Sequence, residues 1–216
     1  MLIWSLQGAT VADKHSSIQL SFKAGETILH PTNAASPNHI YQVASGLVKI
    51  FQVNNQGDNF ILRYVSPGEF FGEESLIDLE RRYYVEAVID TNIYIININN
   101  LYLSLANDMA IDLLNNIDNI YKSIQQISSF HLQSRLAAML LELANYPIAN
   151  RDSRGQTIIR ITHDELAALA GAARESITKI IGEFAKMGLI KSGYGWLRLT
   201  NAKQLQQLAS EDKQQK

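Results

Sequence analysis

Three side chains that can hydrogen-bond to nucleic-acid bases are spaced so that one face of a helix would carry them together. Arg174, Glu175 and Lys179 lie near the start of a segment that ends at Gly188, and apolar residues recur at helical spacing on its opposite face, at positions 177, 180, 181 and 184. Arginine and lysine donate to guanine O6 and N7, and glutamate accepts from cytosine N4. The pattern predicts a helix that buries one face and presents the other to base edges in DNA.

The preceding residues would position that helix. Thr162 and Glu165 have the spacing of a capping box, which starts a helix with apolar positions 166, 167, 169 and 170. Gly171 then supplies a turn residue that tolerates positive φ. A small residue where the helices touch (Ala167) and an apolar anchor (Ile177) complete the pattern of a helix-turn-helix. An αα-hairpin with only a structural role is the alternative.

A short hairpin after the second helix favours the DNA-binding interpretation. Gly188 ends the helix, and segments 190–192 and 196–199 are typical of two strands around a turn at 193–195. A helix-turn-helix followed by such a wing is typical of DNA-binding domains. The charge distribution agrees: residues 1–132 hold 7 basic and 13 acidic residues, a net charge of −6, whereas residues 133–216 hold 12 and 8, a net charge of +4.

Other functional classes find little support in the sequence. The 216 residues include no cysteine, which excludes disulfides and cysteine-ligated clusters, and the five histidines lack metal-ligand spacing, with His30 and His39 nine residues apart. A metal-dependent small-barrel enzyme is therefore only a remote alternative, and we expect neither an enzyme nor a haem protein. No apolar run is long enough to span a membrane, and the first residues do not form a signal peptide. These features predict a cytoplasmic protein with no membrane partner.

The first hundred residues are typical of a β-sandwich or barrel. Gly46, Gly57 and Gly68 recur at intervals of eleven between alternating or apolar segments. The predicted strands are 27–30, 39–43, 47–53, 59–65, 85–88 and 92–98. A hairpin turn is predicted at 53–57, and a loop from His30 to Asn38.

A long helix follows, from about residue 101 to 130. Its apolar residues recur at steps of four and three, as in a heptad seam: Leu113, Ile117, Ile120, Ile124 and Ile127. The seam predicts a parallel helix pair between two subunits, although packing on the chain's own β domain is the alternative. A homodimer would place two recognition helices about 34 Å apart, one turn of a palindromic operator.

The whole chain resembles the Crp/Fnr family, that of the cyclic-AMP receptor protein and the fumarate–nitrate reduction regulator. Two motifs carry the resemblance: Arg174-Glu175-Ser176, and the cassette Pro67-Gly68-Glu69-Phe70-Phe71-Gly72-Glu73. It implies an α+β fold with an N-terminal β-roll (1–100), a dimerisation helix (101–132) and a C-terminal winged helix-turn-helix (133–216). The implied function is that of a bacterial transcription regulator, by default an activator.

The resemblance also implies roles for individual residues on the DNA side. Arg174, Glu175 and Lys179 match the family positions that contact bases, with lysine in place of an arginine. Three hydroxyl side chains suit phosphate contacts, which position the protein without specifying sequence: Thr162, Ser176 and Thr178. Segment 145–156, expected to be a loop, lies where the family contacts RNA polymerase.

The effector site departs from the family pattern. The candidate effector residues are Gly72, Glu73, Glu74, Ser75, Arg81, Arg82 and Tyr121. Arg82 replaces the serine that follows the family's phosphate-binding arginine, the connecting loop is shorter, and Ile120 and Tyr121 replace polar purine contacts. Three interpretations stay open. Arg81 and Arg82 bind another small anion, such as 2-oxoglutarate; a cyclic nucleotide binds in an altered pose; or the arginines pair with Glu73, Glu74 or Asp78 as surface salt bridges. The departures predict a domain that does not respond to cyclic AMP.

Overall fold

The computed structural model describes residues 18–31, 38–77 and 79–210. The first residues, which we expect not to form a signal peptide, lie outside the described residues, as does most of the loop predicted from His30 to Asn38. The chain packs into two units: Met1–Val48 with Val65–Leu114, and Lys49–Tyr64 with Asn115–Lys216. The domain boundaries at 100/101 and 132/133 stay predictions.

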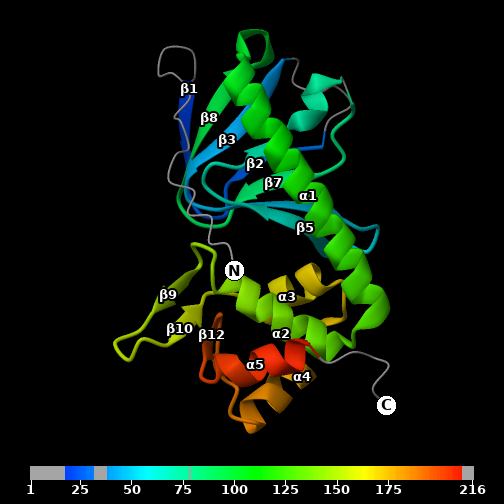
Figure 1. Cartoon of the computed structure of the whole chain (residues 1–216), viewed down its shortest axis with the longest axis vertical. Coiled ribbons are helices and arrows are strands. Elements are labelled where there is room, and N and C mark those ends of the chain that lie inside the picture. The colour runs from blue at the N-terminus through cyan, green and yellow to red at the C-terminus, as the bar shows by residue number, and fades with distance from the viewer. Residues whose placement is uncertain (1–17, 32–37, 78, 211–216) are drawn as a thin grey trace. The chain divides into compact units, whose positions relative to one another are not determined.

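The N-terminal strands form two four-stranded sheets, as the sandwich prediction requires (Figure 1). The first has the order β1-β8-β3-β6 and is antiparallel throughout: β1 Ile18–Phe22, β8 Thr91–Asn97, β3 His39–Ser45 and β6 Phe70–Phe71. The second has the order β2-β7-β4-β5: β2 Thr27–Leu29, β7 Tyr84–Ala87, β4 Val48–Val53 and β5 Asn59–Val65. All six predicted strands are confirmed to within two residues. The predicted β4–β5 turn is also confirmed, with Gly57 at φ 89°.

Two strands of these N-terminal sheets were not predicted. β1 alternates apolar and polar residues over five positions, a strand signal that sequence reasoning missed, and four of its five residues are exposed. β6 has only two residues, too few for any periodicity. Short 3-10 turns follow β6 and β8, namely η1 Glu73–Leu76 and η2 Ile98–Asn100.

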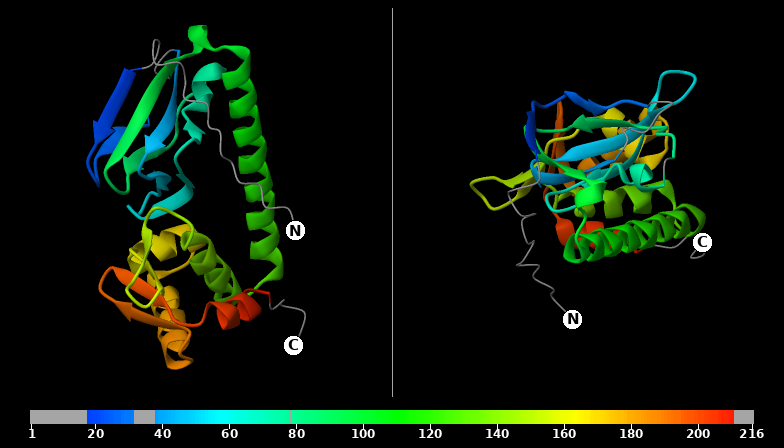
Figure 2. Two further views of the ribbon diagram at one scale, coloured as in Figure 1. Left: turned by 60° about the vertical axis from the view of Figure 1, so that its left-hand side comes forward. Right: turned by 90° about the horizontal axis from the view of Figure 1, so that it is seen from above.

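The predicted long helix is confirmed as α1, Leu103–Ser129. Its first turns pack on the first sheet, where Leu105 and Met109 join Ile40, Phe70 and Ile96 in one buried cluster (Figure 2). Because these residues share one core, the start of α1 packs against β6, the strand within the cassette.

The C-terminal residues form a group of helices with a third four-stranded sheet beside them (Figure 1). The helices are α2 Leu132–Leu143, α3 His163–Ala170, α4 Arg174–Lys186 and α5 Ala202–Ala209. The sheet has the order β11-β12-β10-β9: β11 Ile190–Gly193, β12 Trp196–Leu199, β10 Thr157–Ile159 and β9 Ala149–Arg151. β11 and β12 confirm the predicted wing.

The expectation of a loop over 145–156 is wrong in part, because β9 lies within it and pairs antiparallel with β10. The segment is polar and has no alternation, so its only strand signal is the turn at 152–155. There the side chain of Asp152 accepts hydrogen bonds from the backbone N–H of Arg154 and Gln156, both at 2.9 Å. The partner strand β10, rather than the local sequence, makes this segment a strand.

Candidate nucleic-acid interface and effector site

The capping box at the start of α3 has the predicted geometry. The backbone N–H of Glu165 donates to Thr162 Oγ1 at 3.2 Å, and the backbone N–H of Thr162 donates to Glu165 Oε2 at 2.8 Å. Two amides that would otherwise lack partners at the helix start are therefore satisfied. The Thr162 hydroxyl also donates to Glu165 Oε2 at 2.8 Å, so in this structure it serves the cap.

The turn between α3 and α4 needs its glycine. Gly171 ends α3 in the left-handed region, at φ 58° and ψ 43°, where a side chain is disfavoured. Arg135 on α2 supports this turn, because its Nη2 donates to the carbonyl oxygen of Ala170 at 2.5 Å. Burial lowers the pKa of the Arg135 guanidinium. Sequence reasoning missed Arg135, which has no local pattern to mark it.

The recognition helix α4 divides into the two predicted faces. Ile177, Ile181 and Phe184 are buried, and Ile180 is half-buried. The exposed face near the helix N-terminus carries the predicted base contacts: Arg174, Glu175 and Lys179. Arg174 Nε lies 3.1 Å from Oδ1 of Asp164 on α3. Both of these side chains are well exposed, so the ion pair is weak and the guanidinium can leave it to reach a base.

The predicted phosphate contacts lie in different environments. Ser176 and Thr178 are exposed on α4. Thr178 Oγ1 lies 3.0 Å from Nδ1 of His163, a hydrogen bond that connects the first turns of α3 and α4. The structure therefore brings Ser176 and Thr178 onto the helix that holds the predicted base contacts, whereas Thr162 caps the neighbouring helix.

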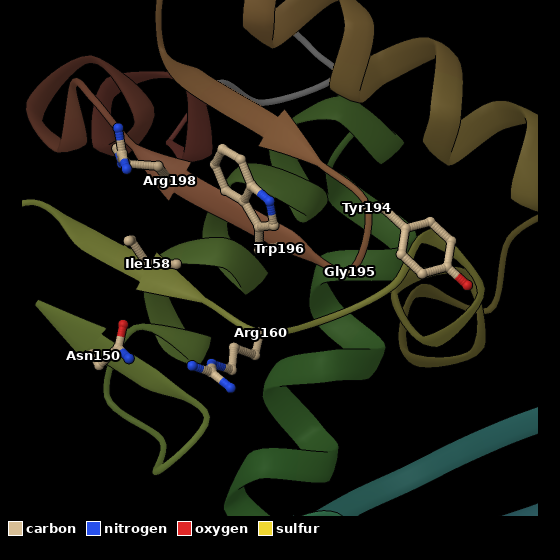
Figure 3. Close-up of a pocket in the computed structure, with 7 residues that line it drawn as sticks. All are labelled: Asn150, Ile158, Arg160, Tyr194, Gly195, Trp196 and Arg198. Carbon is tan, nitrogen blue, oxygen red and sulfur yellow. The ribbon is translucent and has the colours of Figure 1, made fainter. Parts of the chain in front are cut away.

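The outer face of the wing sheet holds a basic and aromatic pocket that sequence reasoning missed. Its volume is about 400 Å³, and Figure 3 shows its lining, which is Asn150, Ile158, Arg160, Tyr194, Gly195, Trp196 and Arg198. The Arg198 guanidinium carbon lies 5.6 Å from the centre of the Trp196 ring, and Arg198 Nε lies 3.3 Å from Asp152 Oδ2. The lining contains no nucleophile beside a base, and its guanidinium groups suit anions rather than catalysis.

The heptad seam of α1 is mostly uncovered in the single chain. Ile117, Ile120, Ile124 and Ile127 are 44–59% exposed, and Leu113 is half-buried. A helix face this apolar is unusual next to water. On another face, Lys122 Nζ lies 2.5 Å from Asp118 Oδ2, an ion pair one helical turn apart.

The cassette glycine is required by its surroundings. Gly72 has φ 86°, and a Cβ at this position would lie 2.8 Å from Cδ2 of Tyr41. Tyr41 stacks on the ring of Phe71, with centroids 5.1 Å apart. The cassette is also tied to α1, because the backbone N–H of Phe70 donates to Asp112 Oδ2 at 3.1 Å.

The arginine expected to bind an anion is deeply buried and already paired. Arg81 is 2% exposed, and its Nε donates to Oε1 of Glu74 at 2.5 Å. The phenol of Tyr83 donates to the other carboxylate oxygen of Glu74. Burial, and then this hydrogen bond, raise the pKa of Tyr83, which keeps the phenol protonated as a donor. The predicted Arg81–Glu74 salt bridge therefore forms, but in the interior rather than at the surface.

The other candidate effector residues lie in different environments. Arg82 is an exposed side chain whose Nη2 lies 3.7 Å from Glu80 Oε2, so the two arginines differ in burial and in partner. Glu73 is half-buried and Ser75 is buried, both in η1. Tyr121, like Ile120 before it, is exposed on α1.

Features of other functional classes are not found in the described residues. None of the His, Asp and Glu side chains in ranges 18–31, 38–77 and 79–210 form a group of three that could hold a metal ion. Within the same ranges, the helices are too short or too polar to cross a membrane.

Two family models match the chain, one for each part. A Crp-like helix-turn-helix domain matches residues 134–208, and a cyclic nucleotide-binding domain matches residues 19–107. The first match covers the four C-terminal helices and the wing. The second covers both N-terminal sheets and the cassette.

Despite that match, the cassette arginine is paired within the chain and is not presented to a ligand in this structure. A cyclic phosphate needs an accessible cation, but the Arg81 guanidinium is buried and paired with Glu74. The Glu74 carboxylate would also repel a phosphate that approached the same cation.

Known proteins resemble the chain over most of its length. The transcriptional regulator SdrP of Thermus thermophilus is 40% identical over 88% of this chain and 93% of its own length. The cyclic AMP receptor protein of the same species is 31% identical over 79% of each chain. The crystal structure of a Crp/Fnr-family regulator, also from Thermus thermophilus, matches with a TM-score of 0.85 and 40% identity, covering 90% of this chain and 99% of that one. These relatives are regulators rather than enzymes, and the chain belongs to the Crp/Fnr family of transcription regulators.

Proposed function

We propose that this regulator binds a palindromic DNA operator as a homodimer and that cyclic AMP does not control it. The observation that carries the DNA contact is the exposed face of α4. There Arg174, Glu175 and Lys179 stand on one side of a helix whose other side is buried. Each can make a hydrogen bond to a base edge that is worth about 1–3 kcal/mol of discrimination. Ser176 and Thr178 then position the helix on phosphate oxygens.

The exposed seam on α1 supports the homodimer. Pairing two copies along Ile117, Ile120, Ile124 and Ile127 would remove an apolar stripe from water. A two-fold axis along this seam would relate two copies of α4, so each would contact one half of a symmetric site. The cations on the outer face of the wing sheet, Arg160 and Arg198, add positive potential to the same DNA-binding unit.

The buried pairing of Arg81 supports independence from cyclic AMP. A ligand shifts the equilibrium between two conformations of a protein only if it binds them with different affinities. A nucleotide that cannot reach Arg81 gains little binding free energy in either conformation. Contact with RNA polymerase through segment 145–156, activation of transcription and a cytoplasmic location belong to the same proposal.

Selection of binding sites from random duplex DNA tests the proposal. The full-length protein, without added nucleotide, should enrich an inverted repeat whose half-sites are centred about 34 Å, or one helical turn, apart. Gel shifts on the enriched site should give the same affinity with and without cyclic AMP. Enrichment of sites without two-fold symmetry would refute the dimer model, and a tenfold or larger gain in affinity with cyclic AMP would refute the independence.

A further inference from the structure

The anion position beside Arg81 is filled from within the chain. Both oxygens of the Glu74 carboxylate have donors, one from Arg81 Nε at 2.5 Å and the other from the Tyr83 phenol. The Glu74 side chain is 9% exposed. The Arg81 guanidinium also lies over the ring of Tyr83, with its central carbon 6.0 Å from the ring centre. The three side chains thus form one buried cluster.

One donor of the cluster is left over. Arg81 Nη2 is buried and has no hydrogen-bond partner among the described residues. A buried donor without a partner is destabilising, and an arginine usually presents two parallel N–H groups to an oxyanion. The guanidinium can therefore bind an anion that has more oxygens than the Glu74 carboxylate, or one that approaches it more closely.

We propose that Glu74 is the resident ligand of an anion-binding site at Arg81, and that this site takes an external phosphate or carboxylate only when the Glu74 carboxylate is removed. Glu74 lies only seven residues from Arg81, at the start of η1, and the cluster is buried. Such a tethered ligand acts at an effective concentration of millimolar or more, so a free anion at micromolar concentration does not displace it. The Glu74 carboxylate then takes the place of an external anion, so the first unit keeps the conformation in which Arg81 is paired without an effector.

The cassette geometry links this occupancy to the rest of the unit. η1, which carries Glu74, directly follows Gly72 and β6, and the backbone of Phe70 in β6 is bonded to Asp112 of α1. Phe70 also packs against Leu105 and Met109. A carboxylate that fixes η1 on Arg81 therefore also fixes the strand on which α1 rests.

The test compares wild type with Glu74→Gln and with the matched control Glu80→Gln. Glu80 is the exposed partner of Arg82, so its substitution removes the same charge nearby without touching the buried cluster. Thermal melting and calorimetric titration use inorganic phosphate, cyclic AMP and 2-oxoglutarate as separate probes, at matched ionic strength. The three probes distinguish a site for any oxyanion from one selective for a nucleotide or a dicarboxylate.

Wild type and Glu80→Gln should bind none of the three probes at micromolar concentration. Glu74→Gln should melt at a lower temperature than wild type, bind phosphate at least tenfold more tightly, and recover melting temperature as phosphate is added. The double variant Glu74→Gln/Arg81→Gln should lose that gain, since the cation is gone. Micromolar binding to wild type, or phosphate binding by Glu74→Gln that survives in the double variant, would overturn the proposal.

If Glu74→Gln does not fold, Glu74→Asp provides the second variant. It keeps the charge but shortens the side chain, so its carboxylate contacts Arg81 less closely and phosphate should still bind more tightly than to wild type. Equal phosphate affinities of Glu74→Asp and wild type would count against the proposal. These readouts do not use DNA, so the inference can fail while the proposed operator binding stands, and the reverse.

Discussion

A carboxylate placed in the α1 seam should dissociate the proposed dimer. The change is Ile120→Asp, at the centre of the exposed stripe that runs from Ile117 to Ile127. In a parallel helix pair the residues of the seam face their own copies, so each dimer would bring the two introduced carboxylates together in an apolar environment. The matched control is Asn115→Asp, which adds the same charge on the polar side of the same helix.

The structure allows a rough magnitude. The four exposed isoleucines are about half exposed, so each would gain about 1 kcal/mol, half of the roughly 1.5–3 kcal/mol of full burial. Eight such side chains in a dimer give about 8 kcal/mol. Losing two of them costs about 2 kcal/mol, and two like charges roughly 6 Å apart at an effective dielectric constant of about 20 add about 3 kcal/mol. A loss of about 5 kcal/mol raises the dissociation constant by roughly three to four orders of magnitude.

Size-exclusion chromatography with light scattering measures the result directly. Wild type and Asn115→Asp should elute with the mass of two chains at about 10 µM, and Ile120→Asp should have the mass of one. Circular dichroism should show the same helix content in all three, because Ile120 has little contact with its own chain. A dimeric mass for Ile120→Asp at the same concentration would show that the seam is not the interface.

Three further predictions concern the DNA-binding unit. Arg174→Ala should weaken discrimination at one base pair of each half-site by about 1–3 kcal/mol. The control Lys186→Ala removes the same charge from the far end of α4 and should leave that discrimination unchanged. Equal effects of the two variants in competitive gel shifts would show that Arg174 does not contact a base. Thr162→Ala should lower the free energy of unfolding by about 1 kcal/mol in urea titrations, and Thr162→Ser should restore most of that loss. An unchanged urea midpoint in the alanine variant would contradict the capping role. The backbone N–H of Gln156 holds the pKa of Asp152 below its usual value, so the ionised side chain stabilises the fold above about pH 4, and this stabilisation is lost as pH falls through the folded pKa. Asp152→Ala should therefore melt below wild type at pH 7, and the two melting temperatures should converge in acid. A difference in melting temperature that stays constant with pH would exclude this linkage.

Local patterns were sufficient for the elements that carry the DNA-binding prediction. The capping box at Thr162, the turn at Gly171 and the apolar stripe through Ile177 depend on residues a few positions apart, so helix geometry alone relates them. The same holds for the heptad seam of α1 and for the hairpin after β4. Elements that depend on a distant partner were missed or misjudged, as with β6 and β9.

The effector site shows most clearly what required the tertiary structure. The resemblance to the Crp/Fnr family pointed to Arg81, and the sequence offered Glu73, Glu74 and Asp78, the last outside the described residues, as partners. It could not choose among them or assign their burial. That choice depends on η1 turning back so that Glu74 meets Arg81 and Tyr83 in the interior. A salt bridge at the surface contributes little, whereas the same pair in the interior is costly to break, so burial decides what Arg81 can bind. Burial is set by packing between segments far apart in the chain, and no local pattern of residues encodes it.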